Sequence, residues 1–216
     1  MEKLIIPEVP KLPKMLFPSL DIQFFGNKVQ FGLKNVHYAP ITITTGEDGK
    51  VTITYGTPIP IPGAVTLTLT PRGELTEFYA DNMLYYSAAA NDGYDGTLSI
   101  AAIPEQFAID ALGEEKDKDD GVLTEKADAK QKQFALMFEF DGDKKATRHV
   151  LYSCSANRPT ITGNTTTNTK EPQPNELTFI SSAREGDLKV KTKTTADTPE
   201  GIYDNWYDSV YEKVTP

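Results

Sequence analysis

The sequence predicts a mainly β protein of the β-sandwich type, with one flanking α-helix, a long protruding β-hairpin and a short C-terminal helix. Two observations carry this prediction. Apolar and polar residues alternate with period two along many short segments, which is the pattern of strands buried on one face. Helical periodicity is confined to two short segments, whereas a fold of alternating strands and helices needs many.

The alternation is clearest at residues 28–34 and 65–70, where every second residue is apolar. The second of these segments stops at Pro71, which cannot donate a hydrogen bond to a sheet. Further strands are predicted at residues 83–87, 97–101, 133–140, 148–155, 177–181 and 188–194.

A β-hairpin is predicted where two β-branched segments, residues 41–44 and 51–55, flank a run of turn-forming residues. Arms of about five to seven residues extend roughly 16–23 Å at the rise of a strand. The loop is the candidate site for contact between stacked copies of the chain, and it consists of Thr45, Gly46, Glu47, Asp48, Gly49 and Lys50.

Two segments have helical signals. Pro104 fits the first position of a helix and Gly113 fits its end, so a helix is predicted at residues 104–113. Near the C-terminus the spacing i, i+3, i+4, i+7, i+8 and i+11 puts six apolar or aromatic residues on one helical face, and a last irregular strand is the alternative. These six are Tyr203, Trp206, Tyr207, Val210, Tyr211 and Val214.

Composition and charge exclude several classes of protein. The chain has 216 residues, with 22 Lys and Arg against 31 Asp and Glu, which gives a net charge of −9. A protein that binds nucleic acid tightly needs a basic face, so the net negative charge argues against a nucleic-acid-binding protein. A single cysteine, Cys154, excludes a disulfide scaffold, and no apolar run approaches the roughly 20 residues that span a bilayer.

No catalytic, cofactor or metal site is predicted. The sequence has no phosphate-binding glycine-rich loop and no nucleophile elbow. Cys154 would need His37 or His149 as a base, and a buried, inert cysteine is the simpler interpretation. His149 lies within a predicted strand, where we expect a hydrogen-bonded structural histidine. One Cys and two His do not supply the closely spaced ligands of a zinc site.

Residues 1–26 and 27–216 differ in character. The first segment has four prolines by residue 18 and no signal-peptide pattern, so we expect an extended N-terminal arm, either a loose terminus or a segment that docks on a neighbouring subunit. Synthesis in a reducing cytoplasm follows as the default.

Residues 114–120 hold five acids and two lysines and are expected to form a solvated loop. Residues 114–132 and 159–175 are the candidates to order on assembly.

Five stretches, taken in order and spacing, resemble the major tail tube protein of long, non-contractile phage tails, in the branch common in phages and prophages of Gram-positive bacteria. They span the chain from about residue 27 to its end, while residues 1–26 depart from the family pattern. The stretches are residues 27–40, 92–96 followed by the helix at 104–113, 134–142, 152–159 and 204–207.

The resemblance implies a structural protein of the virion tail, assembled in the cytoplasm of the bacterial host. In this family, subunits are β-sandwiches with a flanking helix, and six of them form a ring. Rings stack into a tube around the tape-measure protein, a tail terminator closes the tube, and genomic DNA later passes through the lumen without specific binding. A lumen lined by Asp and Glu would repel phosphate, so the net negative charge is consistent with passage of DNA through the tube.

Two other functions stay open from the residues alone. A non-catalytic β-sandwich adhesion or carbohydrate-binding module would use exposed aromatic residues such as Tyr85 and Tyr86 as a sugar platform. A hydrolase on a β-scaffold would need a pair of carboxylates, and the sequence singles out none.

Overall fold

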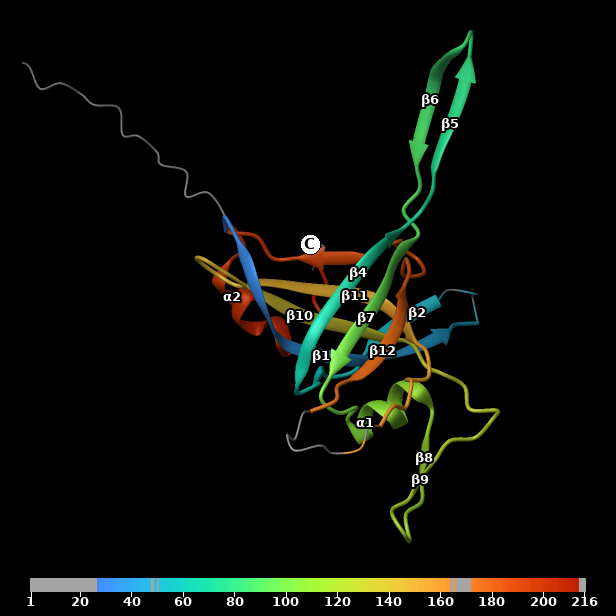
Figure 1. The fold of residues 1–216 in the computed structure, drawn as a ribbon, viewed down its shortest axis with the longest axis vertical. Helices are drawn as coiled ribbons and strands as arrows, with labels where there is room; N and C mark the ends of the chain where they lie inside the picture. Colours follow the sequence, from blue (N-terminus) through green and yellow to red (C-terminus); the bar gives the residue numbers. More distant parts are fainter. Residues whose placement is uncertain (1–26, 48, 50, 164, 166–171, 214–216) are drawn as a thin grey trace, which may run out of the picture.

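The computed structural model describes residues 27–47, 49, 51–163, 165 and 172–213. It confirms a mainly β fold with two short helices. The predicted N-terminal arm, residues 1–26, lies outside the described residues. Figure 1 shows a compact β body from which one hairpin, formed by β5 and β6, stands out at the top of the view.

The body is built on a nine-stranded sheet in which every pairing is antiparallel. The order along the sheet is β2-β1-β10-β11-β12-β7-β4, with β3 paired to β1 and β13 paired to β11. Its strands are β1 (Gln30–Thr45), β2 (Val51–Tyr55), β3 (Ile59–Pro60), β4 (Ala64–Arg72), β7 (Gly93–Ile100), β10 (Phe134–Gly142), β11 (Thr147–Ala156), β12 (Asn175–Ser181) and β13 (Lys191–Lys193).

One main core fills the concave side of this sheet. The sheet curves so that β4, at one end, contacts β1, near the other end. Residues of both strands therefore pack in the same core. The helical segment α1 (Glu105–Phe107) and the π-helical turn η1 (Ala108–Leu112) cover the core. Phe107 packs edge-on against Tyr38 and Phe134, with ring centroids 5.0 and 5.2 Å apart.

A second core lies on the opposite face of β10 and β11. There Trp206 and Val210 pack over residues that include Met137 and Tyr152. The helix α2 (Glu200–Asp204) and the 3₁₀ turn η2 (Asn205–Tyr207) bring Trp206 to this face. Because β10 is covered on both faces, its sequence is a continuous apolar run, whereas β12 has one exposed face and alternates.

The structure differs from the predicted elements at three places. Residues 28–34 and 41–44 belong to one long strand, β1, which bends at bulges near Gly32 and Asn35, both with positive φ. The helix at 104–113 is present but short, and ends at Gly113 with φ 80° as expected. The C-terminal helix begins earlier than predicted, at Glu200, and ends at Tyr207, while Val214 lies outside the described residues.

Two small sheets complete the fold. The strands β5 (Leu75–Ala80) and β6 (Met83–Ala89) form the protruding hairpin, and β8 (Glu115–Lys116) pairs with β9 (Leu123–Thr124). The acidic segment at 114–120, predicted as a loop, therefore contains the short strand β8 followed by a turn. No helix among the described residues is long and apolar enough to cross a membrane.

Candidate assembly surfaces

The predicted contact loop, residues 45–50, lies at the tip of a β1–β2 hairpin. Ile41 pairs with Tyr55 and Thr45 with Val51, which confirms the predicted hairpin. In the loop, the N–H of Gly49 donates to the carbonyl of Gly46 at 2.9 Å. The structure brings Thr45, Gly46, Glu47 and Gly49 together as exposed residues, and Asp48 and Lys50 lie outside the described residues.

The base of this hairpin is fixed to the body by Tyr55. Its hydroxyl donates to the Tyr152 carbonyl at 3.2 Å and accepts from Arg184 at 3.1 Å. Arg184 is buried and also pairs with Asp187 and Glu212, so it links the hairpin to the C-terminal segment. Burial raises the pKa of Tyr55 to about 12, which keeps the phenol protonated. The hairpin thus has a rigid base and an exposed tip.

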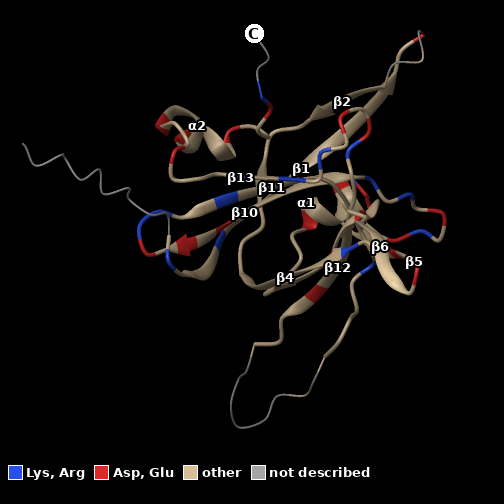
Figure 2. Ribbon diagram, turned by 90° about the horizontal axis from the view of Figure 1, so that it is seen from above, with Lys and Arg blue, Asp and Glu red and all other residues tan. Residues whose placement is uncertain are grey.

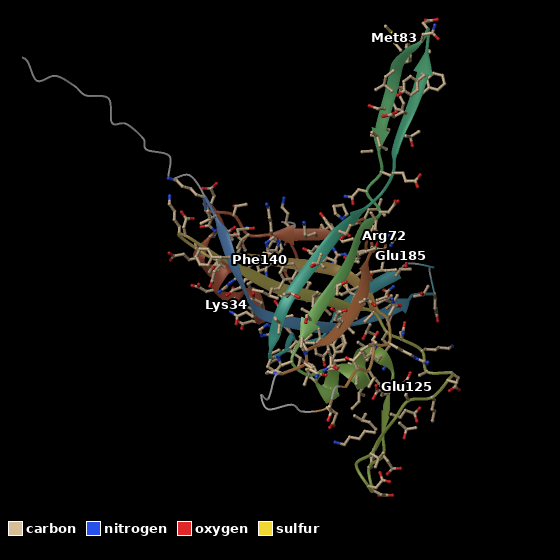
Figure 3. All side chains as sticks on the ribbon, viewed as in Figure 1. Lys34, Arg72, Met83, Glu125, Phe140 and Glu185 are labelled. Carbon is tan, nitrogen blue, oxygen red and sulfur yellow. The ribbon has the colours of Figure 1, made fainter. Side chains whose placement is uncertain are left out.

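The hairpin that projects furthest is a different one, β5–β6. Its strands pair from Leu75 with Ala89 to Ala80 with Met83, and a two-residue turn joins them. Asp81 and Asn82 in the turn have φ of 51° and 60°, as a type I′ turn requires. Figure 3 shows Met83 at the far tip and Arg72 near the point where the hairpin leaves the body.

The β5–β6 hairpin is apolar on its surface. A two-stranded hairpin alone is marginally stable in water, and soluble monomers rarely expose large contiguous apolar patches. Yet seven large apolar side chains of this hairpin are each about half or more exposed: Leu75, Phe78, Tyr79, Met83, Leu84, Tyr85 and Tyr86. Such a ribbon is typical of a surface that another molecule covers.

The exposed face of β4, β7 and β12 is mostly polar, although it also includes the partly exposed Ile180. Thr68, Thr97 and Thr178 lie side by side across the three strands. Asp95 and Glu176 are the acids of this face, and their side chains are exposed. One cation is close, because Arg72 lies 3.6 Å from Asp95. At the end of the sheet, the outer side of β4 has no further strand paired to it among the described residues.

A buried acid helps to hold the C-terminal turn η2 on β10. Glu139 accepts hydrogen bonds from Arg148 at 2.9 Å, from Asn35 at 2.7 Å and from the Tyr207 hydroxyl at 3.3 Å. Arg148 also stacks on the Tyr203 ring at 3.9 Å. Burial and the negative charge of Glu139 raise the pKa of Tyr207. The charge pair is therefore structural, with every oxygen of the carboxylate engaged.

Two of the residues considered for catalysis, Cys154 and His149, are buried. Cys154 is fully enclosed, and burial raises the pKa of its thiol to about 12, so the prediction of a buried cysteine is confirmed. His149 is buried as expected but is not hydrogen-bonded: neither ring nitrogen has a partner. It stacks on Phe138 instead, with centroids 5.0 Å apart and the planes 3° from parallel. No group of three or more potential metal ligands occurs in the part of the chain that the structure describes.

Comparison with known proteins gives a structural likeness. No model of a protein family matches the chain, and a search of curated proteins finds no match. Among solved structures, the chain is similar to the anti-feeding prophage cap, described as the tube terminating cap, seen by cryo-EM. The two are 11% identical with a TM-score of 0.45, over 82% of this chain and 100% of that chain. A similarity this remote assigns no role to particular residues.

The predictions from the sequence did not include the β5–β6 hairpin. They placed a strand at residues 83–87 but left residues 75–80 unassigned. A local signal was present, since Asp81-Asn82 between two apolar segments favours a tight hairpin turn. What the sequence does not show is that the hairpin stands clear of the body with its aromatic residues exposed.

Proposed function

We propose that this chain is the structural subunit of a phage tail tube and has no catalytic activity. The observation that carries the proposal is the β5–β6 hairpin, an exposed apolar ribbon that projects from a compact β body (Figure 1). A subunit that assembles through such a ribbon buries it against another copy. The resemblance of residues 27–216 to major tail tube proteins supports the same function.

In this proposal six copies form a ring and rings stack into a tube. Ring formation joins different surfaces of neighbouring copies, head to tail, and the unpaired side of β4 suits such a contact. One hairpin then reaches along the tube axis. The two candidates project from the body in different directions, and they are β5–β6 and the loop at residues 45–50 that the sequence singled out (Figure 1). The tape-measure protein inside the tube and a tail terminator at its end are the proposed partners, in a virion tail assembled in the host cytoplasm.

The exposed face of β4, β7 and β12 is the proposed lining of the lumen. DNA slides through a tube only if the wall does not bind phosphate, and cationic side chains bind it by releasing counterions. This face carries threonines together with Asp95 and Glu176, and Arg72 beside it is close to Asp95. The carboxylates of such a wall repel the phosphate backbone, and its hydroxyl groups carry no charge that would attract it.

Electron microscopy of the purified full chain tests this proposal. Stacked rings or tubes at high protein concentration are expected. A chain that stays monomeric by light scattering at the same concentration would argue against a tube subunit.

The alternative is a non-catalytic adhesion or carbohydrate-binding module. The exposed Tyr85 and Tyr86 favour it, because aromatic rings can stack on sugars. Binding to a glycan array that is lost on substitution of these two tyrosines, together with a stable monomer, would support the module and contradict the tube.

A further inference from the structure

A pocket lined by lysines lies where three distant segments meet: the start of β1, the turn between β10 and β11, and the residues that follow β13. The cavity measures about 310 Å³. Lys144, Lys145 and Lys193 line it together with the threonines at 147, 194 and 195, and no described Asp or Glu is among the lining residues. We call it the lysine pocket.

The backbone of the lysine pocket is held rigidly. The side-chain oxygen of Asn27 accepts the N–H groups of Lys144 at 3.2 Å and Lys145 at 3.1 Å. Gly142 leaves room for Asn27, since a Cβ at that position would lie 2.0 Å from its amide nitrogen. On the other wall, the buried Thr194 hydroxyl accepts the N–H of Arg148 at 2.9 Å. The lysines therefore project from a fixed frame.

Two of the three ammonium groups have identified surroundings. The Lys145 ammonium lies 3.7 Å from the centre of the Tyr203 ring, so an aromatic face and not a carboxylate holds it there. Lys193, on β13, lies opposite the buried His149 of β11. Asp143, in the turn between β10 and β11, accepts the backbone N–H of Lys28.

The complementary charge lies in the segment at residues 114–120, which we call the acidic loop. In Figure 1 it follows α1 at the bottom of the view, away from the end of the body where β1 begins. Figure 2 marks basic residues on β10 and β11 and near β13.

In the acidic loop, Lys116 pairs with Glu105, and Glu115 pairs with Lys126. The remaining acids have no ion-pair partner among the described residues: Glu114, Asp117, Asp119 and Asp120.

We propose that the acidic loop of one copy enters the lysine pocket of the next copy in the assembly. The proposal rests on the tube function above, and it names the charged contact between copies. A head-to-tail contact needs two different, complementary surfaces on opposite sides of one chain, and the lysine pocket and the acidic loop meet that requirement. Charge complementarity of this kind selects partner and register, and like charges brought together are strongly disfavoured.

A charge-swap experiment on the full chain tests the contact. The pocket variant carries Lys144→Glu and Lys193→Glu, and the loop variant carries Asp119→Lys and Asp120→Lys. The swap variant carries all four changes. Lys213→Glu, an exposed lysine on the C-terminal segment, is the matched control for reversing a charge elsewhere. The readout is the critical concentration for assembly by sedimentation, with circular dichroism as a check that each variant is folded.

The pocket variant and the loop variant are each expected to raise the critical concentration at least about tenfold, since each brings like charges together. The swap variant is expected to recover assembly, and the control to behave as wild type. Pocket and loop variants that assemble as well as wild type, or a folded swap variant that fails, would overturn this contact while leaving the tube function standing. A wild-type chain that never assembles would overturn the tube function itself.

Discussion

Removing the aromatic rings of the β5–β6 hairpin should weaken assembly strongly and leave the subunit folded. The perturbation is the triple variant Phe78→Ser, Tyr85→Ser and Tyr86→Ser. These side chains are 57%, 71% and 59% exposed, so they contribute little to the core. The folded subunit loses the cross-strand pair of Phe78 and Tyr86 and the contacts around it. This loss should lower the free energy of unfolding by about 1 kcal/mol.

The loss on assembly is much larger. Each ring buries about 200 Å² when fully covered, so the three expose about 370 Å² in the isolated subunit. At about 25 cal/mol per Å² this area corresponds to about 9 kcal/mol, which is a ceiling because association itself costs free energy. If a quarter of the ceiling is realised, about 2 kcal/mol, the critical concentration rises about thirtyfold.

The assay is sedimentation over a range of protein concentrations, paired with urea unfolding of the dilute subunit. Leu188→Ser is the matched control, because Leu188 is an exposed apolar residue outside the hairpin. The control should assemble normally. A triple variant that polymerises at the wild-type concentration would refute the view that the hairpin joins copies, and one that unfolds would show that it belongs to the fold.

Three further predictions concern other parts of the molecule. Arg148→Met leaves Glu139 buried without its cation and should lower the free energy of unfolding by about 3–5 kcal/mol in urea titrations; an unchanged midpoint would contradict the structural role of the pair. His149 has a pKa lowered to about 4, chiefly by burial. As the pH falls, the unfolded chain therefore binds a proton on this imidazole at a higher pH than the folded chain does. Stability should therefore be complete above about pH 6.5 and fall by about 3 kcal/mol towards pH 4, and His149→Phe should flatten this profile in unfolding measured across that pH range. Deletion of residues 45–50 should weaken stacking more than subunit folding, and normal tubes from this variant would count against the loop as a contact.

The sequence predicted those parts of the fold that a local pattern specifies. The strand β12 alternates because one face is in water, and the end of the 104–113 helix follows from the freedom of Gly113 to adopt positive φ. The joining of two predicted strands into β1 escaped prediction, because the bulges that keep it continuous depend on its partner β10.

The surfaces were less predictable than the core. The turn at Asp81-Asn82 indicates a hairpin, but only the tertiary structure shows that it projects. The lysine pocket had no signal in the sequence, because Asn27, Lys144 and Lys193 are more than a hundred residues apart at the extremes and meet only after the sheet has formed. The segment 114–120 was visible as an acidic run, but its position opposite the pocket was not.

Electron microscopy of the purified full chain at increasing concentration, with light scattering on the same samples, shows directly whether copies assemble into a tube. We expect rings that stack into hollow tubes of uniform diameter. A homogeneous monomer at every concentration, with no rings on the grids, would contradict this expectation.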